Sequence, residues 1–402
     1  MNISPTWAKN FRVIGENIID LQLHTVWRLE HVEEKAGFAN CYDFKRFDTP
    51  SADVKACAAS GDVLVLTDKM SADGTLDCEL PSGRWRIYRF GASLTGKMNH
   101  PASPNATGLE VDKMDKAAWM RYFQKYIEMY KDAAGGLLGE RGVTHMLVDS
   151  YEAGPATWTP TLPQEFKARR GYDLLPWLPV LTGQIIVSSK RSEQFIRDWR
   201  QTLGELFTEN YNRLNEIVAS YGMKGTYVES HETGRAFMGD GMDAKKKATV
   251  PMSAIWMTES PSGSMLASAI SDIRESASVA HIYGQNIAAA ESFTVNGEDK
   301  RAYTYYPGNI KRIADIALAS GLNRFVGTTA HPSRLTTISP VSGCSNTGNG
   351  SIATRPGHPM RRPGRIILRA AARCCRQGGM SRIYFSSMAR IPMPHLNTVE
   401  ST

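Results

Sequence analysis

The sequence lacks the segments by which a chain enters or crosses a membrane. It has no run of about 18 apolar residues, the length typical of a transmembrane helix. Residues 1–7 lack the basic region followed by an apolar stretch that marks a secretory signal peptide. The sequence therefore predicts neither a membrane span nor a signal peptide.

The sequence also lacks the short motifs of several enzyme classes. It contains no GxSxG nucleophile elbow, no Walker-type phosphate loop and no GxGxxG at a strand-to-helix turn. These absences argue against a serine hydrolase and against a nucleotide-binding enzyme. The six cysteines form no CxxC pair and have no histidine nearby at zinc-site spacing. We therefore expect unpaired thiols and no structural zinc.

Acidic residues and lysine are nearly missing from residues 333–402. This segment holds ten arginines, no lysine and one acid, Glu400, which gives it a formal charge of +9. Since the whole chain carries +7, the remaining residues carry −2. A mildly acidic body does not resemble a basic groove, and the arginines of this tail lack interleaved aromatic residues. We therefore expect no nucleic-acid partner.

Acidic residues follow two short apolar segments that are typical of buried parallel strands. Residues 146–148 run into Asp149 and Glu152, and residues 286–290 run into Glu291. In α/β folds the loops after such strands carry the chemistry. Glycoside hydrolysis needs one acid to protonate the leaving oxygen and one carboxylate to activate water or attack the sugar, so Glu152 and Glu291 are the predicted catalytic pair.

Asp149 could hold a proton or raise the pKa of Glu152 by its like charge. Each of these acids has an ordinary alternative role. A lone acid at the end of a strand more often caps a helix or pairs with an arginine.

Strand-like and helix-like segments alternate along the chain in the manner of a (β/α)8 barrel. The first 84 residues have the pattern of a β-rich insertion before the third strand, with a hairpin closed at residues 81–83. The first two barrel strands have no counterpart, so we predict an α/β fold with a barrel that is incomplete at its amino end. The expected domains are 1–84, 85–332 and 333–402. The expected strands are 85–90, 146–148, 224–229, 250–256, 286–291 and 322–327, and the expected helices are 115–130, 192–221, 272–283 and 308–320.

Further polar and aromatic residues are candidates for binding a substrate. His100 lies in a long polar loop, and Glu229 and His231 follow the strand expected at 224–229. Either segment could equally be a solvated connection. Trp256 ends another expected strand, and Tyr303 lies in an aromatic loop that could stack on a sugar face or pack against a helix.

Several motifs resemble those of the α-L-rhamnosidases of glycoside hydrolase family 106. The resemblance extends from about Trp85 to His331. The motifs that carry it are Gly108-Leu-Glu-Val-Asp-Lys, Val148-Asp-Ser-Tyr-Glu-Ala-Gly, Arg169-Arg-Gly-Tyr-Asp-Leu, Ser278-Val-Ala-His-Ile-Tyr-Gly284, Ala290-Glu-Ser-Phe-Thr294 and Gly321-Leu-Asn-Arg-Phe-Val326.

The resemblance implies a (β/α)8 catalytic domain that removes terminal α-L-rhamnose from glycosides or polysaccharides with inversion. By position it implies Glu152 as the general acid, Glu291 as the general base and Asp149 as the acid beside Glu152. It also implies calcium at the sugar site, for which Glu110 and Asp112, together with Glu229, are the acids to consider first. Members of this family are expected in the periplasm or outside the cell.

The resemblance stops after His331, where the arginine-rich tail begins. A shift of reading frame near Pro332 would explain this change, and the tail would then have no function of its own. We regard the chain as an amino-truncated family member. An alternative to hydrolysis is a catalytically inactive fragment that binds carbohydrate, because a barrel without its first strands lacks the neighbours needed to close it.

Overall fold

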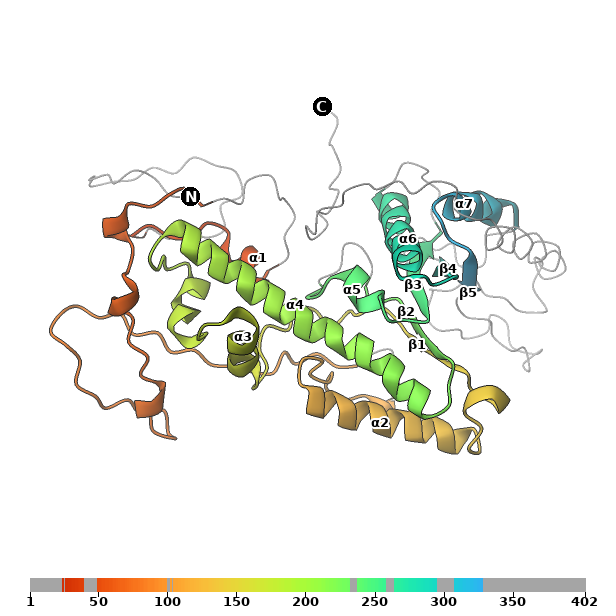
Figure 1. Ribbon diagram of the computed structural model, residues 1–402, viewed down its shortest axis with the longest axis horizontal. Helices are drawn as coiled ribbons and strands as arrows, with labels where there is room; N and C mark the ends of the chain where they lie inside the picture. Colours follow the sequence, from red (N-terminus) through yellow and green to blue (C-terminus); the bar gives the residue numbers. More distant parts are fainter. Residues whose placement is uncertain are drawn as a thin grey trace, which may run out of the picture. The chain divides into compact units, whose positions relative to one another are not determined.

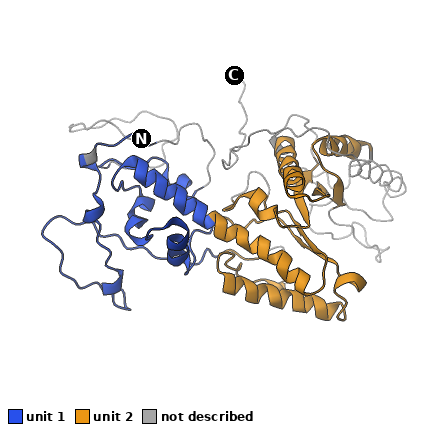
Figure 2. Ribbon diagram, in the orientation of Figure 1, with its two compact units in different colours: residues 1–96, 155–203 blue, residues 97–154, 204–402 orange. Residues whose placement is uncertain are grey.

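The computed structural model describes residues 24, 26–39, 49–99, 102, 104–231, 237–257, 264–294 and 307–327. Two predicted substrate-binding residues, His100 and Tyr303, and the tail 333–402 lie outside these ranges. Two compact units, coloured separately in Figure 2, comprise residues 1–96 with 155–203 and residues 97–154 with 204–402. The expected division at residues 84 and 332 stays a prediction.

The first unit packs short helices around aromatic side chains. Phe166, Phe195 and Trp199 are almost completely buried, and the indole N–H of Trp199 donates to the carbonyl of Ala36 at 3.0 Å. α3 carries a proline in its first turn and ends at Gly171 in a left-handed conformation, so its sequence signals both ends of the helix. The helices of this unit are α1 (Val32–Ala36), α3 (Leu162–Arg170), η6 (Leu175–Thr182) and the first part of α4 (Ser189–Ser220).

The β-rich insertion expected within residues 1–84 is not seen in the described part of the chain. Residues 85–90 form no strand, so this strand prediction and the prediction of a hairpin closed at residues 81–83 were wrong. Trp85 is 38% exposed and Ile87 is 66% exposed. Apolar alternation makes a strand only where another strand satisfies its backbone groups. The short turns of this region are η1 (Val54–Ala56), η2 (Ser60–Asp62) and η3 (Thr67–Lys69).

The second unit is built on five parallel strands. They lie in the sheet in the order of the sequence, from β1 to β5, as Figure 1 shows. All four neighbouring pairs are parallel, which requires the crossover segments that the chain supplies between them. The sheet is curled like part of a barrel and confirms five of the six expected strands, while closure to eight strands stays a prediction. The strands are β1 (His145–Val148), β2 (Gly225–Val228), β3 (Val250–Trp256), β4 (Ala289–Thr294) and β5 (Arg324–Gly327).

Helices cover one face of this sheet. Trp119, Phe123 and Ile127 recur at helical spacing along α2 and pack with Met146 of β1 and with Leu214 in the second part of α4. α2 and this part of α4 lie side by side in Figure 1. α6 and α7 pack in the same way against β3 and β4. Besides the second part of α4, the helices of this unit in the described ranges are η4 (Pro104–Ala106), α2 (Lys116–Ala133), η5 (Gly139–Arg141), α5 (Gly241–Lys245), α6 (Ser264–Tyr283) and α7 (Pro307–Ala319).

The opposite face of the sheet carries the alternate residues of each strand. Tyr227 faces the same side as its register partners Leu147 and Val250, and it packs in one apolar cluster with Met252 and Ala289. Because side chains alternate along a strand, residues two positions further on lie on this face too. The acids that follow β1 and β2 therefore project from the same face of the sheet.

None of the helices in the described ranges is long and apolar enough to cross a bilayer. Cys57 and Cys78, which lie in those ranges, are free thiols.

Candidate active site

The loop after β1 carries two acids on one short polar turn. The N–H of Ser150 donates to Asp149 Oδ1 at 3.0 Å, and the hydroxyl of Ser150 donates to Glu152 Oε1 at 3.0 Å. Gly154 then takes a left-handed backbone with φ +78°, which turns the chain away. Ser150 therefore links the two carboxylates without neutralising either.

Three carboxylates from three strands meet at the carboxyl edge of the sheet. One oxygen each of Asp149, Glu229 and Glu291 lies within 4.8 Å of the others, and we call these residues the carboxylate group. Asp149 follows β1 and is exposed, Glu229 follows β2 and is fully buried, and Glu291 lies within β4 and is half-buried. The parallel register explains the meeting, because Val148 pairs with Val228 and the N–H of Glu229 continues the ladder to the carbonyl of Val148 at 3.0 Å.

A residue with a left-handed backbone follows each of the two less exposed acids. Ser230 has φ 67° directly after Glu229, and Phe293 has φ 68° two residues after Glu291. Phe293 is the extra residue of an irregularity between β3 and β4, after which the hydroxyl of Thr294 hydrogen-bonds Glu291 Oε1. Such conformations are unfavourable for residues other than glycine and cluster at functional sites.

A cavity of about 140 Å³ lies beside the carboxylate group. Asp149, Glu152 and Glu110 line it together with Lys113 and Tyr211, as part of a wider lining. Asp149 therefore belongs both to the cavity and to the carboxylate group.

Tyr151 fixes the position of the loop between the two acids. Its N–H donates to the carbonyl of Ser230 at 2.9 Å, which joins the loops after β1 and β2. Its ring meets Phe207 edge-on at 4.9 Å, and the ammonium of Lys113 lies 5.1 Å from its centre. Burial, with a smaller effect from the negative charge of Glu110, raises the pKa of Tyr151 to about 12, so this phenol is neutral at physiological pH.

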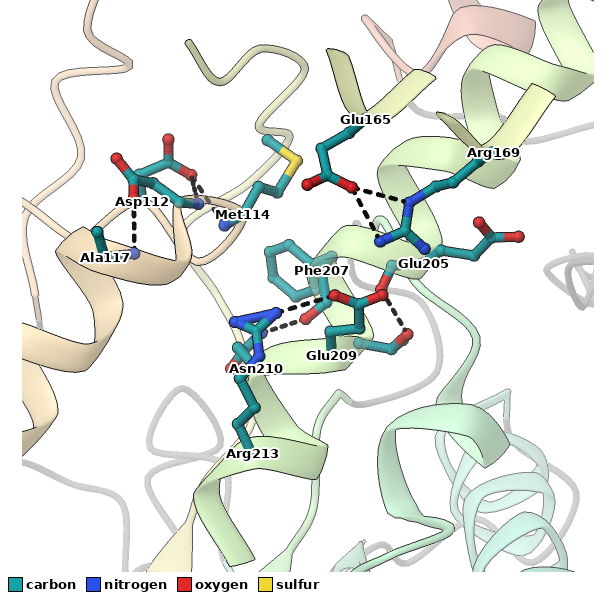
Figure 3. Close-up of polar contacts among 12 residues, drawn as sticks. Asp112, Met114, Ala117, Glu165, Arg169, Glu205, Phe207, Glu209, Asn210 and Arg213 are labelled. Carbon is teal, nitrogen blue, oxygen red and sulfur yellow. Dashed lines mark hydrogen bonds and ion pairs between the residues drawn. The ribbon is translucent and has the colours of Figure 1, made fainter. Parts of the chain in front are cut away.

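The loop before α2 places Glu110 and Asp112 in different roles. Lys113 Nζ lies 2.7 Å from Glu110 Oε1, which gives the cavity an ion pair in its wall. Asp112 Oδ1 accepts the N–H of Met114 at 2.9 Å and that of Asp115 at 3.3 Å, and Figure 3 shows Asp112 turned toward Met114. Asp112 therefore holds the turn that leads into α2.

Other acids near the site have structural partners. In Figure 3, Glu209 and Arg213 lie one turn apart on α4, and Arg213 Nη2 lies 2.9 Å from Glu209 Oε2. Pairs at this spacing stabilise a helix by a few tenths of a kcal/mol. Glu209 therefore takes part in a pair within one helix, whereas the members of the carboxylate group come from separate strands.

The three oxygens of the carboxylate group lie close enough together to share one cation. Calcium takes six to eight oxygen ligands at about 2.3–2.6 Å, so two oxygens on one ion lie at most about 5 Å apart. Three carboxylate oxygens within 4.8 Å of one another satisfy that limit. The donor set consists of oxygen alone, which suits calcium rather than zinc or copper.

The sequence of the chain matches the family model of the α-L-rhamnosidases of glycoside hydrolase family 106 over residues 8–346. This chain belongs to that family. The match covers the strands, both acid-bearing loops and the helices between them, and it extends past His331, where the resemblance described above stops.

Two relatives are identical to this member of family 106 at about a third of the aligned positions. A protein of Formosa agariphila provisionally named β-glucuronidase is 33% identical over 283 residues, which cover 69% of this chain and 23% of that protein. The solved structure of a rhamnosidase from Novosphingobium sp. PP1Y is 34% identical with a TM-score of 0.72, covering 89% of this chain and 34% of that one. The chain thus spans about a quarter and about a third of the lengths of these two relatives.

The structure brings several of the predicted site residues of this family member together. Asp149, Glu229 and Glu291 form the carboxylate group, and Glu152 and Glu110 line the adjoining cavity. The roles of these residues as acid, base or metal ligand stay predictions. Asp112 lies outside the carboxylate group.

The remaining predicted residues lie in different surroundings. The ring of His231 stacks on Phe237 at 4.7 Å, and its Nε2 lies 4.0 Å from Glu275 Oε2. Trp256 ends β3 and is half-buried. Their contacts with substrate stay predictions, and His100 and Tyr303 lie outside the described residues.

The residues of the site that were not predicted from the sequence include Lys113, Tyr151 and Tyr211. Lys113 ends the motif that contains Glu110, Tyr151 lies between the two acids of the β1 loop, and Tyr211 reaches the cavity from α4. Lys113 and Tyr151 could have been found from the sequence, because each lies next to predicted acids in these motifs. For Tyr211 the helical pattern of α4 gave none.

Proposed function

We propose that this chain carries the catalytic region of an α-L-rhamnosidase that removes terminal α-L-rhamnose from glycosides or polysaccharides with inversion. The observation that supports this most directly is the convergence of acids from separate strands at one edge of the sheet. Family membership supplies the reaction class, and the convergence supplies the two acids that the reaction needs. Such an enzyme would act in the periplasm or outside the cell.

Glu152 and Glu291 divide the two proton transfers. The carboxylic acid of Glu152 donates its proton to the glycosidic oxygen as the bond from that oxygen to the sugar breaks. Glu291 takes a proton from the water whose oxygen forms the new bond at the anomeric carbon, from the opposite side. Asp149 borders both regions and is the acid beside Glu152 on the loop after β1, where Ser150 hydrogen-bonds both carboxylates.

The carboxylate group would hold calcium through Asp149, Glu229 and Glu291. When bound, the ion would attract the sugar hydroxyl groups and offset the negative charges of the group. A carboxylate has two oxygens, so binding an ion through one of them is compatible with accepting a proton on the other. Glu110 and Asp112 remain alternative ligands, although Glu110 already pairs with Lys113 and Asp112 with backbone N–H groups.

Replacement of Glu291 tests the proposed reaction. We expect Glu291→Ala to abolish hydrolysis of an aryl α-L-rhamnoside, because the group that takes the proton from the attacking water is lost. Asp315→Asn, at an exposed ion pair on α7, is the matched control and should keep full turnover. Unchanged turnover in Glu291→Ala would remove this residue from the mechanism.

A second candidate is carbohydrate binding without turnover. The sheet favours this candidate, because within the described residues β1 and β5 are edge strands, each paired on one side only, and do not close a barrel. Titration of the unaltered chain with rhamnose, followed by assays on aryl rhamnoside and aryl glucuronide, distinguishes the candidates. Binding without release of either aglycone supports the binding function, and release of the glucuronide alone would change the sugar assigned here.

A further inference from the structure

A buried ion pair joins α5 to α6. Lys245, at the end of α5, is completely buried, and its Nζ lies 2.8 Å from Glu275 Oε1 on α6. The same ammonium donates to Ser276 Oγ at 3.2 Å, and that hydroxyl donates to the carbonyl of Met252 in β3 at 2.9 Å. Burial alone would raise the pKa of Glu275, but the charges of Lys245 and His231 outweigh it and hold the pKa below its usual value. The pair is therefore charged and tied to the sheet.

His231 connects this ion pair to the loop that carries Glu229. Its Nε2 lies 4.0 Å from Glu275 Oε2, and its Nδ1 lies 3.2 Å from the hydroxyl of Ser230. Phe237 covers the ring in a stacked contact at 4.7 Å. Gly241 makes the close approach possible, because a Cβ there would lie 2.4 Å from both His231 Cε1 and Glu275 Oε1.

The contacts continue from His231 to the carboxylate group. Ser230 holds the left-handed backbone that directly follows Glu229, and its carbonyl accepts the N–H of Tyr151 at 2.9 Å. Glu229 is fully buried, and one of its carboxylate oxygens lies within 4.8 Å of an oxygen of Asp149 and of Glu291. Every step from α6 to the carboxylate group thus lies within the second unit.

We propose that Lys245, Glu275 and His231 are positioning residues for the carboxylate group: Glu275, held by Lys245, keeps His231 against Ser230, and the left-handed backbone of Ser230 then directs Glu229 toward Asp149 and Glu291. This inference rests on the proposed function for its effect on turnover. Its structural part, the fixed position of the loop after β2, can be measured independently.

A purely stabilising role is the alternative for the ion pair. Removing one partner of a buried pair strongly destabilises a protein, whereas replacing both partners by apolar residues of similar size is often neutral. A double replacement therefore separates the two roles. If the pair only stabilises the fold, the chain with two apolar residues keeps its activity.

The experiment compares two variants with wild type. Lys245→Met combined with Glu275→Leu removes the pair as a unit, and His231→Gln leaves the pair in place but removes the imidazole. We expect both to melt near the wild-type temperature and to lower kcat for an aryl α-L-rhamnoside about 10- to 100-fold, the usual effect of losing a residue that orients a functional group. KM should change less than kcat.

A neighbouring exposed ion pair supplies the matched control. Lys246 and Asp243 lie 3.4 Å apart on the other side of α5, and each side chain is about a third exposed. Lys246→Gln combined with Asp243→Asn should leave kcat within twofold of wild type. The control shows whether loss of any ion pair at α5 slows turnover.

Hydrogen exchange gives a readout that does not depend on catalysis. Loss of positioning should speed exchange of the Tyr151 N–H, which donates to Ser230, while peptides from α6 keep their protection. If exchange is faster in both variants and the wild-type chain is itself inactive, the positioning role is supported and the proposed function is refuted. Unchanged exchange and wild-type kcat in a folded double variant would overturn the inference, and so would a loss of protection spread evenly through α6.

Discussion

Glu229 is the fully buried member of the carboxylate group, and its replacement tests whether the group binds a cation. Glu229→Gln keeps the shape of the side chain and removes one negative charge. Two unit charges 4.8 Å apart repel each other by about 3 kcal/mol at an effective dielectric constant of about 20. This repulsion applies to the charges of Glu229 and half-buried Glu291. The charge of exposed Asp149 is better screened by water and repels the other two less.

The metal-free variant should therefore be more stable than metal-free wild type. After allowance for relaxation, we expect a gain of about 1–2 kcal/mol, which corresponds to about 2–4 °C per kcal/mol in a unit of this size. Calcium should reverse the order. At a concentration about 100 times its Kd, calcium raises the free energy of unfolding of a chain that binds it by about 2.7 kcal/mol. The wild-type chain should gain far more of this stabilisation than the variant.

Melting curves in chelator and in a calcium series measure both effects, and the same series with magnesium is the control. Magnesium prefers a tighter octahedral shell and should raise the melting temperature less. A wild-type melting temperature that does not respond to calcium, together with no gain for Glu229→Gln in chelator, would refute the reasoning. Neither measurement requires the chain to hydrolyse a glycoside.

Three further predictions concern the general acid, the core and one histidine. Glu152→Gln should slow hydrolysis of an alkyl rhamnoside far more than that of a nitrophenyl rhamnoside, because a good leaving group needs little protonation; equal losses on both substrates would contradict its role as acid. Ile273→Ala, at a fully buried position of α6, should lower the free energy of unfolding by about 2–5 kcal/mol in a denaturant titration, and a loss below 1 kcal/mol would show that the site lies outside the core. Burial, together with the charges of Arg324 and Lys224, lowers the pKa of His145 below its usual 6.5. Since the unfolded chain then binds the proton more readily, the stability from neutral His145 is complete above about pH 6.5 and is lost as the pH falls below it, and His145→Gln should flatten that part of the stability curve.

The periodic parts of the fold could be predicted from the sequence. The helix expected over 115–130 is α2 (Lys116–Ala133), and the one expected over 192–221 is α4 (Ser189–Ser220). Asp115 caps α2, accepting from the N–H groups of Ala117 and Ala118. These elements were predictable because their own side chains, through a buried stripe and a cap, determine where they begin and which face they bury.

The strand expected at 85–90 failed for the opposite reason. A strand is stable only beside another strand, and alternating apolar residues carry no information about whether that neighbour exists. The acids at the ends of β1 and β4 could be named from short motifs, but their distance from Glu229 depends on the curl of the sheet. The ion pair of Lys245 with Glu275 joins residues far apart in the sequence, and the residues around each of them do not predict it.

The positions of the acids follow from the packing of the whole second unit. The left-handed backbones of Ser230 and Phe293 each cost about 1–3 kcal/mol, and they persist only where the surroundings enforce them. Phe293 stacks on Phe325 of β5 at 5.4 Å, and Ser230 is held through Tyr151 and His231. A glycine at either place would relieve the strain but would also free the backbone beside an acid. The site is therefore held from the helix-covered side of the sheet as well as by its own loops, and substitutions there should change the distances among the three carboxylates.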